Sequence, residues 1–462
     1  MRPLSVVVVS TVLVLAASGS VSANGFLVPS VGAKASGLAG AFIGLADDYS
    51  AAFWNPAGIM QIKGTDVTLL AQDAVSLGSR EGVIAFDGAA GYSIPVRAEV
   101  AATADAGHRV LPGIFLYPKF SLGALFDKVG LAAYTFADYG TRWAGDAVYD
   151  DIVAVYPTQP SSPLGYRRVM GEAPNTESRL TSYAISPLVA KEIVPGLSFG
   201  LAGHAVYTSL ETKLGTWYEE RWVDTSGPQT VNRGDLHPIQ MEDSATGWGY
   251  CATAGIMFKA TDALSFGAVV RTPMTVAMAG EIEVSSTHPD HATPKQDQEY
   301  DLVFPMWAGL GIAYRDVLVD GLTLTVDGAW TQWSKYKGIA RVVDAELPSE
   351  LHLDGADPEW KDTIEVGAGL DYRLSRALSM RAGYRNVPSP GDAEHYTAAF
   401  PQIAKNAVAA GMTYRSSAWH ADLSLEYQIG EKLIVPANVN YDNNGEHVGD
   451  LVVTSLSLTY AF

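Results

Sequence analysis

Hydrophobic and polar residues alternate with a period of two through most of the chain. In residues 419–429, every second residue from Trp419 is apolar, and the residues between include Asp422 and Glu426. Residues 364–374 show the same arrangement. Because successive side chains of a strand point to opposite faces, the pattern predicts strands with one apolar and one charged face.

The alternation predicts about fourteen strands, and because weak strands are easily miscounted, about twelve or sixteen are the alternatives. The candidate strands are residues 65–76, 110–121, 129–143, 176–192, 196–213, 243–259, 262–280, 303–315, 321–333, 361–374, 377–387, 405–416, 418–429 and 449–462. Short gaps such as 259–262 and 374–377 alternate with long polar ones such as 144–175, 214–242 and 281–302. Short turns at one end and long loops at the other are typical of outer-membrane barrels.

The charged faces decide between a soluble sheet and a barrel. A soluble protein seldom directs Glu, Asp and Arg inward on one strand after another, whereas a barrel with a lipid-facing wall and a polar lumen does. The final segment, 451–462, carries an apolar face that ends in the aromatic Phe462. An edge strand of a soluble sandwich is the alternative for that segment alone. The predicted fold class is therefore all-β, a transmembrane antiparallel β-barrel over residues 65–462.

The first residues have the pattern of a secretory signal. Arg2 precedes an apolar stretch, 4–17, and small residues at 21–23 suit a cleavage site. We expect residues 1–23 to be a signal peptide and the mature chain to start at Asn24. No later run approaches the ~20 apolar residues of a membrane-spanning helix.

Residues 24–64 lack the alternation of the later strands. Residues 34–46 are small, apolar and interrupted by glycine, which predicts a short buried helix. Asn55, Pro56 and Ala57 predict a helix start, because Asn is a favourable N-cap and Pro suits the first helical position. We expect this segment to be a partly helical hatch inside the lumen, with a periplasmic appendage as the alternative.

The predicted lumen face carries repeated glycines, which leave space, and charges of both signs. The charged residues are Asp327, Glu365, Asp371, Asp422 and Glu426 on one side and Arg271, Arg315, Arg373, Arg381 and Arg385 on the other. Paired, they would support a wide barrel without leaving an uncompensated charge. Guidance of a ligand carboxylate is the second interpretation.

Composition limits the kinds of molecule that the chain is expected to bind. The formal net charge of −19 argues against nucleic acid. Negative charge in outer loops would meet divalent cations and lipopolysaccharide, or would serve solubility alone. Cys251 is the only cysteine, so no intramolecular disulfide forms. His204 lies in a predicted strand with Ser198 and Ser209, but no nucleophile motif surrounds them, so we expect no catalytic residue, no metal and no cofactor.

Several short motifs resemble one family in order and spacing over nearly the whole mature chain. NGF at 24–26, SGLAGAF at 36–42, ADD at 46–48 and NPAG at 55–58 resemble the hatch of the FadL/TodX family of outer-membrane transporters for long-chain fatty acids and hydrophobic compounds. The downstream pieces are FPMW at 304–307, DGAWTQWSKY at 327–336, WKDTIEVGAGLDYRLSRALSMRAGY at 360–384 and FP at 400–401. The resemblance implies a hatch-closed barrel, which we expect to be a monomer.

The resemblance also implies a lateral opening in the third strand. In the family, a ligand leaves the lumen sideways into the membrane through a gap made by a kink in that strand. Here the strand is about 130–143. The positions assigned to the opening are Ala132, Tyr134, Phe136 and Gly140.

The ligand contacts that the resemblance implies are the mature N-terminus, Asn24, Gly25 and Phe26, at a deep pocket. Fatty-acid members place a basic residue in this pocket after a Val-Tyr pair, whereas the residues that follow the pair here, Thr208 and Ser209, are neutral. A second basic position falls near Arg341, which is the candidate substitute.

The function that follows is uptake of a hydrophobic small molecule by passive stepwise binding and lateral exit into outer-membrane lipid. Long-chain fatty acids are the first expectation, and neutral aromatic or alkane hydrocarbons are the alternative. An outer-membrane lipolytic enzyme is less favoured because no catalytic constellation is visible. A general porin is less favoured because 24–64 is apolar.

Overall fold

The structure is a computed structural model of the chain. It describes residues 25–86, 96–105, 108–144, 146–149, 169–172, 176–224, 231–286, 292–339, 342–343, 357–396, 400, 402–436 and 445–462. The predicted signal peptide and Asn24 lie outside these residues. Among them, no helix is both long enough and apolar enough to cross a membrane.

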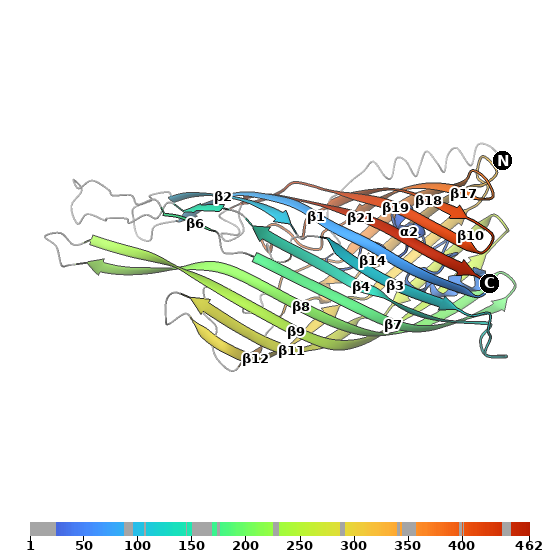
Figure 1. The fold of residues 1–462 in the computed structure, drawn as a ribbon, viewed down its shortest axis with the longest axis horizontal. Helices are drawn as coiled ribbons and strands as arrows, with labels where there is room; N and C mark the ends of the chain where they lie inside the picture. Colours follow the sequence, from blue (N-terminus) through green and yellow to red (C-terminus); the bar gives the residue numbers. More distant parts are fainter. Residues whose placement is uncertain are drawn as a thin grey trace.

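Fourteen antiparallel strands close into a barrel within the described part of the chain (Figure 1). Most are single elements: β1 (Asp66–Phe86), β4 (Lys128–Ala144), β7 (Thr176–Val194), β8 (Leu197–Asp224), β9 (Val231–Lys259), β16 (Thr363–Arg373), β17 (Leu378–Val387), β18 (Lys405–Arg415), β19 (Trp419–Gly430) and β21 (Gly445–Ala461). The others are interrupted: β2 (Val96–Asp105) with β3 (Arg109–Tyr117), β10 (Leu264–Arg271) with β11 (Met274–Ser286), β12 (Thr293–Phe304) with β13 (Trp307–Tyr314), and β14 (Leu322–Thr331) with β15 (Val342–Val343). The predicted strand count is confirmed.

The first and last strands close the wall. β1 pairs with β21 from Asp66 and Ala461 to Glu81 and Glu446. Apolar side chains that the alternation assigned to the outer face, such as Leu425, are exposed. The backbone groups of both end strands therefore have partners, as a membrane wall requires.

The structure corrects the predicted long loops. β8 and β9 pair as far as Asp224 and Val231, inside the predicted loop 214–242, and Figure 1 shows this hairpin reaching beyond the rest of the wall. β11 and β12 likewise extend into 281–302. Within 144–175, β5 (Asp146–Tyr149) pairs with β6 (Val169–Glu172), and β20 (Leu433–Val435) pairs with β21. Strands above the membrane need no apolar face, so the alternation that marks a lipid-facing strand is missing there.

Residues 25–64, which we call the hatch segment, pack against the inner face of the wall. They contain α2 (Ala33–Gly37), α3 (Ala51–Trp54) and the 3₁₀ helix η1 (Pro56–Gln61). α2 contacts β17, β18, β19 and β21, whereas η1 contacts β4, β7, β8 and β9. The helix expected over 34–46 is shorter than predicted, because Ala39 and Gly40 adopt φ of 51° and 82°, which a right-handed helix does not allow.

Inward glycines let this segment approach the strands. A Cβ added at Gly255 would overlap the Asn55 side chain, and one at Gly267 would overlap the carbonyl of Ile43. A Cβ at Gly311 would overlap the backbone nitrogen of Gly44. The space that glycine leaves is therefore occupied by the backbone and polar side chains of the hatch segment.

Asn55 caps η1, as the sequence predicts, and also ties it to the wall. Its Oδ1 accepts from the Ala57 N–H at 3.2 Å. Its Nδ2 donates to the carbonyls of Ile256 on β9, at 3.0 Å, and Ile43, at 3.3 Å. On the wall, Asp327 accepts from the backbone N–H of Ile43.

Ion pairs join the same segment to β16–β19. Arg385 contacts Glu426 at 3.0 Å and Glu365 at 3.3 Å, and it donates to the Pro29 carbonyl. Lys34 Nζ lies 2.7 Å from Asp47 and 3.7 Å from Asp371. Burial acts to lower the pKa of Lys34, but the two carboxylates outweigh it and hold that pKa above its usual value.

The predicted lumen charges thus form pairs only in part. Arg381 contacts Asp422 at 3.2 Å and Asp371 at 3.6 Å. Asp327 bonds hatch backbone instead of an arginine. Arg315 reaches Ser265 and Gln61. Arg271 pairs with no carboxylate among the described residues.

The contact at Gly267 gives a test of how the segment is seated. Gly267→Val should displace the Ile43 region and raise single-channel conductance in planar bilayers, while the heat-modifiable gel mobility of a folded barrel persists. Ala268→Val, one residue along the strand and on the outer face, is the matched control and should conduct as the parent does. Equal conductance of all three proteins would show that the segment does not limit the lumen.

Candidate functional site

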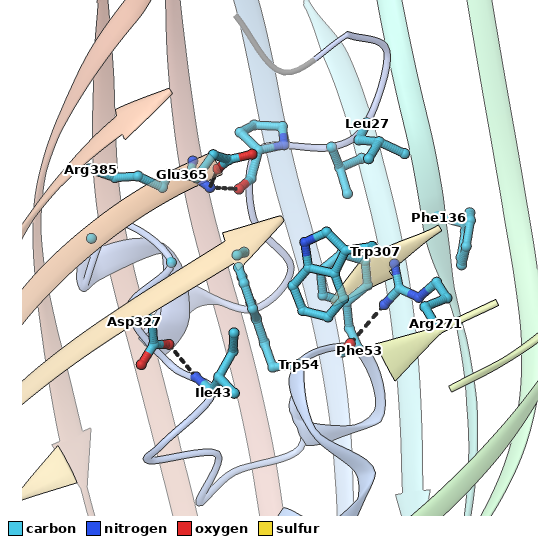
Figure 2. Close-up of a pocket in the computed structure, with 15 residues that line it drawn as sticks. Leu27, Ile43, Phe53, Trp54, Phe136, Arg271, Trp307, Asp327, Glu365 and Arg385 are labelled. Atoms are coloured by element: carbon cyan, nitrogen blue, oxygen red, sulfur yellow. Dashed lines mark hydrogen bonds and ion pairs between the residues drawn. The ribbon is translucent and has the colours of Figure 1, made fainter. Parts of the chain in front are cut away.

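The lumen contains a pocket between the hatch segment and the wall (Figure 2). Its volume is about 40 Å³, room for a few water molecules only. The lining residues are Leu27, Val28, Pro29, Gly40, Ile43, Phe53, Trp54, Phe136, Arg271, Trp307, Asp327, Ala329, Glu365, Gly367 and Arg385. A larger ligand therefore requires part of this lining to move.

Arg271, near the end of β10, is the positively charged residue that lines the apolar side of this pocket. Its side chain donates from Nε to Thr253 Oγ1 at 3.1 Å and from Nη2 to the Phe53 carbonyl at 2.8 Å. The guanidinium lies 4.4 Å from the ring centre of Phe53, 5.1 Å from that of Phe136 and 5.2 Å from that of Trp307. Three aromatic faces stabilise the cation without neutralising it.

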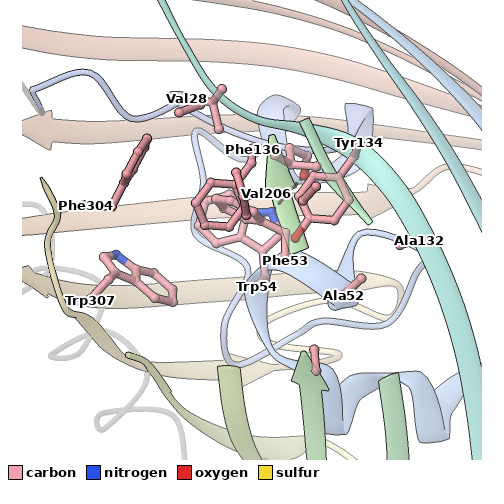
Figure 3. Close-up of a cluster of buried hydrophobic side chains, with 14 of the residues drawn as sticks. Val28, Ala52, Phe53, Trp54, Ala132, Tyr134, Phe136, Val206, Phe304 and Trp307 are labelled. Atoms are coloured by element: carbon pink, nitrogen blue, oxygen red, sulfur yellow. Dashed lines mark hydrogen bonds between the residues drawn. The ribbon is translucent and has the colours of Figure 1, made fainter. Parts of the chain in front are cut away.

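Aromatic side chains continue from this point toward β4 (Figure 3). Phe53 packs against Tyr134 with centroids 6.1 Å apart, and Phe136 packs against Phe304 at the same distance. Tyr134 stacks on Phe115 of β3 at 5.7 Å. The apolar surface is thus continuous from the pocket to the third strand of the barrel.

His204 joins a hydrogen-bond chain beside the pocket. Its Nδ1 lies 2.7 Å from Ser186 Oγ and its Nε2 lies 2.8 Å from Thr253 Oγ1. Its expected neighbours, Ser198 and Ser209, are not its partners. Thr253 in turn accepts from Arg271, so the chain positions the guanidinium.

Phe26 lies in a box of aromatic side chains. Its ring centre is 5.1 Å from that of Trp333, 5.2 Å from Phe304, 5.4 Å from Tyr336 and 6.3 Å from Trp360. Next to it, a Cβ at Gly25 would overlap the Trp333 ring. Of these two predicted ligand contacts, Phe26 is buried and Gly25 is half-buried, while Leu27–Pro29 line the pocket itself.

The wall is incomplete along β4. β4 pairs with β3 only from Leu116 and Leu131 to Gly113 and Tyr134, and it meets β2 only at Ala144 and the residue before it. Between these contacts β4 forms no described ladder with β3 or β2, although it stays paired with β7. We call this stretch, residues 135–142 of β4, the lateral gap. Pro112 of β3 stands beside it and has no N–H to donate.

A bulge accompanies the lateral gap. The register between β4 and β7 shifts between Thr135 and Ala137, leaving Phe136 as the extra residue. Because one extra residue exchanges the two faces of a strand, Asp138 then pairs opposite Thr181 on the outer side of β7. Ala137 also forms an isolated antiparallel bridge with Leu27 of the hatch segment.

The residues predicted for the opening are only partly together. The side chains of Ala132, Tyr134 and Phe136 are buried and face the lumen. Gly140 lies beyond the bulge, opposite Arg179, on the other face. Arg341, the candidate substitute for the missing basic residue, lies outside the described residues. Of the neutral residues that follow the Val-Tyr pair, Thr208 faces inward and bonds Ser182.

Sequence reasoning missed three features of the site. Arg271 was grouped with paired charges, and only its aromatic neighbours and lack of a carboxylate set it apart. The pocket contact of Leu27 carried no signal in the sequence. Pro112 did carry one, since a proline inside a strand marks a broken ladder.

Comparisons with known proteins agree with this fold. The family model described as outer membrane protein transport protein (OMPP1/FadL/TodX) matches residues 166–462. No curated protein sequence matches the chain.

Several solved structures resemble the chain at low sequence identity. A FadL homologue of Pseudomonas aeruginosa has a TM-score of 0.68 and 16% identity, with 95% of this chain and 100% of that chain covered. The toluene transporter TodX of P. putida has a TM-score of 0.64 and 15% identity, covering 94% and 99%. The toluene transporter TbuX of Ralstonia pickettii has a TM-score of 0.59 and 15% identity, covering 94% and 99%. With more than half of its length matched by the family model, the chain belongs to the OMPP1/FadL/TodX family of outer-membrane transport proteins.

Proposed function

We propose that this outer-membrane protein takes up long-chain fatty acids, binding them in the lumen pocket and releasing them sideways into the membrane through the lateral gap. The observation that carries the proposal is Arg271, a buried guanidinium with no carboxylate partner among the described residues, at an otherwise apolar end of the pocket. A ligand with an apolar tail and one carboxylate complements both features.

A buried charge is expensive to keep unless a partner compensates it. Arg381 and Arg385, which are also buried in the lumen, each contact carboxylates. Among the described residues, Arg271 has only two hydrogen bonds and three aromatic faces, so a ligand carboxylate would supply the missing counter-charge.

The route out follows from the hatch segment. Leu27 lines the pocket and also bridges Ala137 in the lateral gap. Movement of this one residue would enlarge the pocket and uncover the gap together. Loss of an isolated bridge gives up far less than unzipping a complete ladder, so the opening needs no energy source beyond ligand binding.

Neutral aromatic hydrocarbons are the second candidate, and one observation favours them. The box around Phe26 shows that the lumen accommodates a benzyl ring in edge-to-face contact with three aromatic side chains and in tilted contact with a fourth, Trp360.

The ligand roles of Asn24, Gly25, Phe26 and Arg341 are part of the same proposal, as are monomeric assembly and contact of the outer loops with lipopolysaccharide.

The two ligand classes respond differently to loss of the cation. Arg271→Met should weaken binding of palmitate by about 10- to 100-fold, the loss of one or more charge-assisted hydrogen bonds, and should leave binding of methyl palmitate nearly unchanged. Isothermal titration or tryptophan quenching on detergent-purified protein measures both.

Arg373, predicted as a lumen charge, is instead exposed at the end of β16. Arg373→Met is therefore the matched control and should bind both ligands as the parent does. If the parent binds acid and ester equally and Arg271→Met is silent, the fatty-acid proposal fails and the hydrocarbon alternative stands.

A reversible cross-link tests the exit route. In a Cys251→Ser background, Leu27→Cys with Ala137→Cys places two cysteines at a paired antiparallel position, where Cα spacing suits a disulfide. Oxidation should stop palmitate transfer into proteoliposome membranes, and dithiothreitol should restore it. The two single-cysteine variants should be insensitive to redox state; undiminished transfer by the fully oxidised pair would rule out this route.

A further inference from the structure

An ion pair fills the lateral gap. Arg109, at the start of β3, reaches across to β4, where its Nε lies 3.3 Å from Asp138 Oδ2. The two side chains are 8% and 3% exposed. The pair therefore lies buried in the opening through which the proposed route passes.

The hydrogen-bonding capacity of Arg109 is largely unused. Among the described residues, Nε and Nη1 have no hydrogen-bond acceptor, and Nη2 lies 3.5 Å from Ser76 Oγ. Asp138 Oδ2 accepts no hydrogen bond there either, and Oδ1 accepts only a long one, 3.4 Å, from Thr181. A buried guanidinium ordinarily uses its donors, so this pair is held by proximity alone.

The surroundings favour an anion over a second cation. Gly140 lies against the guanidinium, and a Cβ there would overlap Nη1. Lys405 of β18 is close enough to Arg109 for the two positive charges to repel each other.

We propose that Arg109 is a second anion site, which receives the carboxylate of a fatty acid as it leaves the lumen. In the empty protein Asp138 stays beside Arg109 with no hydrogen bond between the two side chains. The ligand carboxylate takes its place on Nε and Nη1, and Asp138 keeps its contact with Thr181. This inference rests on the proposed function, because it requires that the ligand carry a negative charge through the gap.

The two arginines then have different effects on transport. Arg271 holds the head group at equilibrium inside the pocket. Arg109 acts on the passage between pocket and membrane, where an uncompensated carboxylate would face unfavourable apolar surroundings. Loss of Arg109 should therefore slow the transfer of an acid without weakening its binding.

The experiment compares palmitate with methyl palmitate in proteoliposomes of phosphatidylcholine. Arg109→Met should bind palmitate within about twofold of the parent protein but transfer it at least about tenfold more slowly, as expected for one lost charge-assisted contact. Transfer of methyl palmitate should not change. Arg109→Lys, which keeps the charge, should retain most of the palmitate rate.

Two further variants control for folding and for the ion pair. Arg373→Met removes an exposed arginine at the end of β16, a strand that forms neither side of the lateral gap, and should behave as the parent. Asp138→Asn removes the competing carboxylate and should transfer palmitate at least as fast as the parent. Equal slowing of acid and ester by Arg109→Met would overturn the proposal and leave the pair a structural closure of the gap.

Failure of the proposed function would look different. In that case the parent protein itself would show no preference for palmitate over its ester in either binding or transfer. A phosphate of a surrounding lipid has similar anionic chemistry, so transfer is repeated with lipopolysaccharide in the liposomes. Competition that slows palmitate in the parent but not in Arg109→Met would assign the site to lipid phosphate and overturn the ligand role.

Discussion

The fold depends on one constraint: inside a membrane, every backbone hydrogen-bonding group needs a partner within the protein. The pairing of β1 with β21 satisfies it at the ends of the chain. The lumen imposes the same demand on the hatch segment, which has little regular structure of its own. Asn55 and Asp327 meet this demand by bonding hatch backbone to the wall, and glycines on β9, β10 and β13 make the approach close enough.

The lateral gap is the place where the constraint is relaxed. Pro112 removes a donor, Phe136 adds an unpaired residue, and Leu27 supplies a partner for Ala137 from the hatch segment. A wall closed partly by a movable segment can open without breaking its permanent ladders. The ion pair of Arg109 with Asp138 closes the remainder, and because it makes so few hydrogen bonds it is weaker than the networks around Arg381 and Arg385.

The sequence was sufficient for the architecture but not for the site. Strand alternation predicts each of the fourteen wall strands, because lipid on one side and a polar lumen on the other impose the same pattern everywhere. It fails for the hairpin of β8 and β9 beyond the wall, where both faces meet water. Asn55 was predictable as a cap because capping is local. The lack of a carboxylate partner for Arg271 was not predictable, since it depends on which residues distant in sequence lie nearby. The bulge at Phe136 was not predictable either, because it follows from pairing with β7.

The size of the pocket bears on which ligands can open it. At about 40 Å³ it admits no hydrocarbon until side chains such as Leu27 and Val28 leave, and exposing a residue of that kind costs ~1.5–3 kcal/mol. Each ligand CH₂ transferred from water returns ~0.8 kcal/mol, so a tail of roughly ten methylenes gains about 8 kcal/mol and offsets two such displacements. A single aromatic ring gains less and can offset about one. Once the tail reaches the lateral gap, the bilayer offers an equally apolar environment, and dilution into lipid is enough to make the passage one-way.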